Sequence, residues 1–65
     1  MNEADAKFTA QNLMALHGLR AQAVVVERIA EARQQGDTTG LERWQNVELA
    51  IGDLRRSASG RSLNS

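Results

Sequence analysis

Apolar residues recur at helical spacing through the last third of the chain. Trp44, Val47, Ile51, Leu54 and Ala58 follow one another at intervals of three, four, three and four residues. Such a repeat lines up one stripe along a helix, of the kind that packs against a neighbouring helix. It predicts a helix from residue 38 to about residue 56. We call Trp44, Val47, Ile51 and Leu54 the seam; the pattern alone leaves open whether the seam is intrachain core or an interface.

Residues 20–35 have a wider apolar face. It combines two adjoining stripes, the first formed by Val25, Ile29 and Ala32 and the second by Ala23, Val26 and Ala30. An apolar arc of about half the helix circumference indicates contact with more than one neighbour. The valine run at 24–26 favours a strand in isolation, but the flanking alanines and the lack of alternation outweigh it. We therefore predict a second helix, with Val25 and Ile29 facing the seam.

Residues 3–17 have the weakest apolar stripe, built mostly from alanine, in which Ala6, Ala10, Leu13 and Leu16 or His17 recur at helical spacing. So thin a stripe is expected to leave part of the seam uncovered. The three segments predict an all-α protein with helices at about 3–17, 20–35 and 38–56, the last two forming an antiparallel hairpin. Residues 1–56 make one domain, and the aperiodic residues 57–65 are expected to form a disordered tail.

Glycines mark the ends of these helices, because the chain contains no proline. Gly18 and Gly36 each follow a helical segment, where glycine readily takes the left-handed conformation that ends a helix. After Gly36, Asp37 can cap the third helix, with Thr39 and Glu42 as an alternative capping box. Gly40 lies four residues before Trp44 and would leave room for the indole.

Other interpretations of the stretch "GDTTG" fail on specific residues. A phosphate-binding loop needs a lysine and a preceding strand, and a calcium loop needs several alternating carboxylates, where this stretch has only Asp37. His17 has no nucleophile or second ligand at a useful spacing, and there is no cysteine. We therefore predict a turn at this stretch, and a protein that is not an enzyme and has no cofactor, metal or small-molecule substrate.

The charge balance and the hydropathy indicate which partners and which location to expect. Eight basic residues balance eight acidic ones, which disfavours nucleic acid as a partner. A small helix-turn-helix DNA-binding regulator remains the alternative, with base or phosphate contacts from Arg20, Gln22, Arg43, Gln45 and Asn46. Neither a membrane-spanning segment nor a signal peptide is recognisable, so no membrane association and a cytoplasmic location are expected.

Residues 17–54 resemble a family of short, uncharacterised proteobacterial helical proteins. The family pattern runs His-Gly, alanine three residues on, arginine in mid-helix, then Gly-Asp-x-x-Gly-x-x-x-Trp-x-x-Ile and a final Ala-Ile-x-x-Leu. These places are filled here by His17, Gly18, Ala21, Arg28, Gly36, Asp37, Gly40, Trp44, Val47, Ala50, Ile51 and Leu54. Val47 replaces the usual isoleucine, and Arg20 stands where an acidic cap of the second helix is expected. The resemblance implies a bacterial helical protein and no established activity.

Association is the function that these features favour. A chain of 65 residues is near the size at which folding buries only about 60% of the unfolded surface. The wide arc on the second helix and the separate seam on the third exceed what so short a chain can cover. We expect a homodimer or a helical protein partner, with helical faces of two chains in one core.

Overall fold

The computed structural model describes the backbone of residues 3–64 and the side chains of residues 5–57. It contains helix α1 (Glu3–His17), the short 3-10 helix η1 (Gly18–Arg20), α2 (Ala21–Gln35) and α3 (Thr38–Asn64). Over these residues the chain is all-helical, which confirms the predicted class, and only Gly36 and Asp37 lie outside a helix. The stretch before them is continuously helical, and η1 is where its direction changes.

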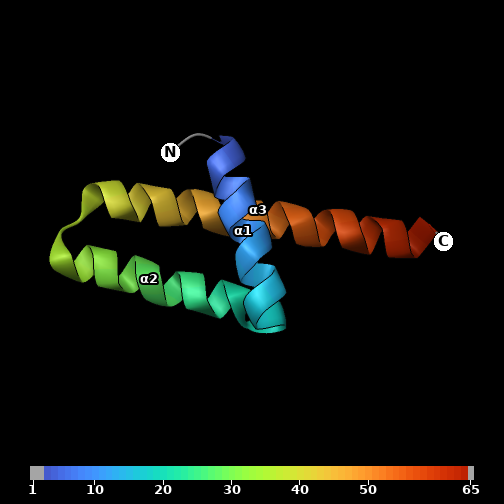
Figure 1. The fold of residues 1–65 in the computed structure, drawn as a ribbon, viewed down its shortest axis with the longest axis horizontal. Helices are drawn as coiled ribbons and strands as arrows, with labels where there is room; N and C mark the ends of the chain where they lie inside the picture. Colours follow the sequence, from blue (N-terminus) through green and yellow to red (C-terminus); the bar gives the residue numbers. More distant parts are fainter. Residues whose placement is uncertain (1–2, 65) are drawn as a thin grey trace.

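The helices α2 and α3 form an antiparallel hairpin, and α1 lies across it (Figure 1). The crossing occurs near the beginning of α2 and the middle of α3, so the later part of α3 extends beyond both other helices (Figure 1). The molecule is elongated, with extents of 45 × 22 × 16 Å. The 27 residues of α3 account for about 40 Å of that length, at roughly 1.5 Å per residue.

Two helix boundaries differ from the predicted ones. The second helix begins at Ala21, whose N–H donates to the Gly18 carbonyl, so η1 leads into α2 without a capping side chain. The third helix continues to Asn64 instead of ending near Arg56. Extending an existing helix adds one hydrogen bond for each residue fixed, and no proline interrupts the ladder. The expected tail, 57–65, falls mostly on residues whose side chains lie outside the described part.

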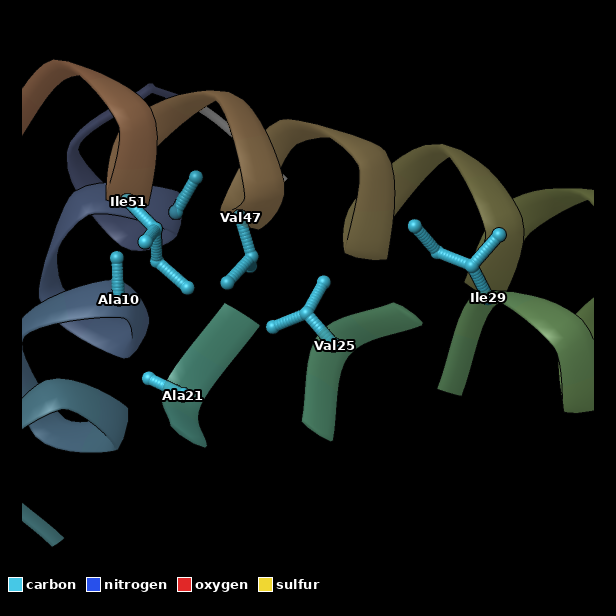
Figure 2. Close-up of a cluster of buried hydrophobic side chains, with 7 residues drawn as sticks. Ala10, Ala21, Val25, Ile29, Val47 and Ile51 are labelled. Atoms are coloured by element: carbon cyan, nitrogen blue, oxygen red, sulfur yellow. The ribbon is translucent and has the colours of Figure 1, made fainter. Parts of the chain in front are cut away.

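The core lies where the three α-helices meet (Figure 2). It consists of Ala6 and Ala10 from α1, Ala21, Val25 and Ile29 from α2, and Val47 and Ile51 from α3. Its largest fully buried side chains are those of Ile51, Val25 and Val47. Burying each of these stabilises the fold by about 1.5–3 kcal/mol relative to leaving it exposed.

The seam is divided between core and surface. Val47 and Ile51 are fully buried within this one chain, whereas Trp44 and Leu54 are half-buried and pack against the same cluster. The expectation that α1 leaves part of the seam uncovered agrees with Trp44 and Leu54, while Val47 and Ile51 are buried within the chain. The small side chains of Ala6 and Ala10 allow α1 to pack directly over α3. This close approach of the two helices helps to bury Val47 and Ile51.

Arg55 connects α3 to the beginning of α2. Its Nη1 donates to Gln22 Oε1 at 2.9 Å, and its Nη2 donates to the Leu19 carbonyl at 3.1 Å. The second bond occupies a carbonyl of η1, at the corner where the chain changes direction. The helix continues past Arg55, and the two bonds of its guanidinium connect α3 to this corner.

Candidate interaction surface

The turn between α2 and α3 is held by hydrogen bonds among its own residues. Gly36 has φ of 69°, its N–H donates to the Arg33 carbonyl at 3.2 Å, and the Asp37 N–H donates to the Ala32 carbonyl at 2.8 Å. These two bonds form a Schellman motif, the ending that a left-handed glycine permits. Asp37 then caps α3, because its Oδ1 accepts from the Gly40 N–H at 2.9 Å. These amides donate within the chain and are not presented to a phosphate.

Gly40 serves Asp37 and not Trp44. A β-carbon added at residue 40 would lie 2.8 Å from Asp37 Cγ, and the three atoms nearest to it all belong to Asp37. The space next to Gly40, which the sequence assigns to the indole, is occupied first by the capping carboxylate. Gly18, which follows the end of α1, has φ of 58°, and there is open space around its missing side chain.

Ionisable side chains are dispersed over the surface. Two ion pairs join neighbours one turn apart on a single helix, Arg28 with Glu31 and Arg56 with Asp53, and all four side chains are more than half exposed. His17, the last residue of α1, is exposed. In the described residues no three His, Cys, Asp or Glu side chains gather as they would around a metal ion. No helix there combines the length and apolarity required to cross a membrane.

Large apolar side chains lie outside the core on several elements. Leu19 is 91% exposed, Leu16 78%, Leu49 68%, Phe8 65% and Val26 49%. Phe8 is the single phenylalanine of the chain and lies two positions from each of the buried alanines at 6 and 10, so it points roughly away from the core. Composition does not reveal this distribution, because it depends on which side of each helix faces a neighbour.

Two hollows flank α3 on opposite sides. One, of about 320 Å³, lies between α1 and α3 and is lined by Ala6, Lys7, Asn46, Leu49, Ala50 and Asp53. The other, of about 250 Å³, lies between α2 and α3 and is lined by Val26, Ile29, Ala30, Arg33, Gln45 and Glu48. Asn46 and Glu48 are two residues apart, which places them on nearly opposite sides of a helix. The second hollow is thus on the side of the hairpin that α1 leaves uncovered.

No family model, curated protein or solved structure matches the chain. The resemblance of residues 17–54 to short proteobacterial proteins therefore stays a prediction from the residues themselves. What can be said of function rests on the arrangement of the side chains described above.

Proposed function

We propose that this chain is a non-enzymatic helical protein that acts through protein–protein association, and that its first partner is a second copy of itself. The observation that carries the proposal is an apolar stripe on α2 that no other helix covers within the described residues. The stripe with Ala23, Val26 and Ala30 is exposed, Val26 to 49%, while the neighbouring stripe with Val25, Ile29 and Ala32 is buried. Contiguous exposed apolar surface is typical of interaction sites.

The accessible surface supports the same proposal. The chain exposes 4884 Å². A folded monomer of 7.1 kDa is expected to expose about 4,100 Å². The excess of about 800 Å² equals what each partner buries in an interface of standard size. Part of this excess belongs to the overhang of α3, and the remainder is available to a partner.

The proposed interface is not the seam of the sequence prediction, because Val47 and Ile51 are covered within the chain. In the proposal α1 acts as a third helix that completes the core of each copy, and association uses surfaces outside that core. The absence of catalysis stays part of the proposal. It is supported by the dispersed ionisable groups and by the turn amides, which already donate within the chain.

The DNA-binding alternative receives no comparable support. Of its candidate contacts, Gln22 already accepts a hydrogen bond from Arg55. Arg28 and Arg56 are each paired with a carboxylate on the same helix. A protein that neutralises several phosphates needs a surface on which cations cluster, and here they alternate with acids.

Sedimentation equilibrium tests the proposal directly. Between about 1 and 100 µM, the range of moderate affinities, the mass should rise from that of one chain to that of two. A single-chain mass over the whole range, with helical circular dichroism retained, would contradict self-association.

A further inference from the structure

The side of the hairpin that α1 does not cover has the features of a docking surface. We call it the open face and define it by Val26, Ala30 and Arg33 on α2 and Gln45 and Glu48 on α3. Ile29, nearly buried, forms part of the floor of the hollow between them. In Figure 1 α1 crosses one side of the hairpin, and no helix lies on the other side.

The second apolar stripe of α2 ends on this face. Its first stripe, with Val25, Ile29 and Ala32, is buried against the rest of the chain. Its second stripe, with Ala23, Val26 and Ala30, is exposed. The wide arc of α2 predicts two neighbours, and within the described residues the chain supplies one only to the first stripe. The second stripe consists of small and branched side chains, over which another helix can approach closely.

The charges on the open face make it complementary to itself. Arg33 lies on its α2 side and Glu48 on its α3 side, around the same hollow. In residues 5–57 neither side chain belongs to an ion pair. A twofold axis parallel to the helices would place α2 of one copy over α3 of the other, antiparallel and at the same level. Because both residues line the same hollow, this operation places Arg33 of each copy and Glu48 of the other around one shared cavity.

We infer that the open face docks against the open face of a second copy, so that two α2–α3 hairpins form a four-helix bundle. This inference rests on the proposed self-association and names its surface. Neighbouring helices joined by short loops in a bundle are usually antiparallel. Among soluble homo-oligomers, twofold dimers with an isologous interface are the commonest. The part of the excess surface that does not belong to the overhang of α3 is available to such an interface. Each α1 lies on the outside of the bundle, with its hairpin between it and the other copy.

A charge-exchange experiment on the full chain tests the inference. Arg33→Glu gives two acids on each open face, and Glu48→Arg gives two bases. Each variant alone should dimerise about tenfold or more weakly than the parent chain, because like charges then meet across the interface. Mixed in equal amounts, the two variants should form a heterodimer with close to the parent affinity. Recovery on mixing cannot come from an intrachain pair, since each chain carries only one of the changes.

Apolar substitutions locate the surface independently. Val26→Asp should abolish the dimer and keep helical circular dichroism, because Val26 is 49% exposed in the single chain. Phe8→Ser is the control, because Phe8 is an exposed apolar residue on α1, away from the open face, and it should leave the dimer unchanged.

The outcomes separate this inference from the proposed function. A parent chain that remains a monomer overturns both. A parent dimer that survives Val26→Asp overturns only the open face as its interface. A parent dimer for which the mixed charge variants pair no better than each variant alone also overturns this inference, and self-association then stands.

Discussion

The carboxylate of Asp37 occupies the space in which a side chain at residue 40 would begin. Asp37 Cγ lies 2.8 Å from an ideal β-carbon on Gly40, and Asp37 Oδ1 accepts the hydrogen bond of the Gly40 amide. The Asp37 cap in this geometry therefore depends on the lack of a side chain at residue 40. The usual rule that alanine is better than glycine inside a helix meets a competing cost at this position.

A double-mutant cycle measures that dependence. Gly40→Ala gains about 0.5–1 kcal/mol from helix propensity but displaces a cap worth about 1 kcal/mol, so in the parent chain it should be neutral or destabilising. In an Asp37→Ala background the obstruction is absent, and the same substitution should stabilise by about 0.5–1 kcal/mol. Urea denaturation of the four chains gives the coupling energy. Equal effects in both backgrounds would show that the cap and the glycine are independent.

Gly36 should not tolerate a β-branched side chain. Its φ of 69° ends α2, and Gly36→Val should lower the free energy of unfolding by roughly 1 kcal/mol or more. Gly52→Ala is the matched control, because Gly52 lies inside α3 without positive φ and its nearest obstacle is Arg56 Nη1 at 3.8 Å. That control should stabilise by about 0.5–1 kcal/mol. Thermal melts measure the change in stability of both variants. If both substitutions stabilised the protein, or both destabilised it, the result would be inconsistent with a left-handed Gly36.

Arg55 and Arg56 are neighbours with different expected importance. Arg55→Met removes the bonds to Gln22 and to the Leu19 carbonyl and, after allowance for partial exposure, should cost about 1 kcal/mol. Arg56→Met removes only an exposed pair with Asp53 and should change stability by about 0.5 kcal/mol or less. Chemical denaturation measures the free energy of unfolding of the two variants. Equal effects would mean that the bond to the corner contributes nothing.

The close approach of α1 should make the core intolerant of bulk at Ala10. Ala10→Leu adds three carbons where α1 packs over α3 and should destabilise by about 1–3 kcal/mol. Ala15→Leu makes the same change on an exposed position of α1 and should stay within about 0.5 kcal/mol of the parent. Melting temperatures at one protein concentration compare them. Similar values for the two leucine variants would show that α1 does not pack closely.

The parts that the sequence predicts well are those decided by local geometry. Gly36 and Asp37 form the expected turn because a left-handed glycine and a capping carboxylate act on groups at most five residues away. The spacing of Val47 and Ile51 likewise predicts which side of α3 is buried.

The contacts that the sequence does not predict are those that depend on how the helices are arranged in space. The partners of Arg55 are 33 and 36 residues distant, and one of them is a backbone carbonyl, which leaves no signal in residue type. For Gly40 the pattern predicts Trp44 as the neighbour, whereas the atoms nearest to its missing side chain belong to Asp37.

The turn between α2 and α3 also bears on the order of events during folding. Its hydrogen bonds join residues 32–41, so closing it requires little loss of chain entropy. The bond from Arg55 to Leu19 must instead bring together groups 36 residues apart. We therefore expect the hairpin to be largely formed in the transition state, with high φ-values at Val25 and Val47, and the packing of α1 to follow, with low φ-values at Ala6 and Ala10.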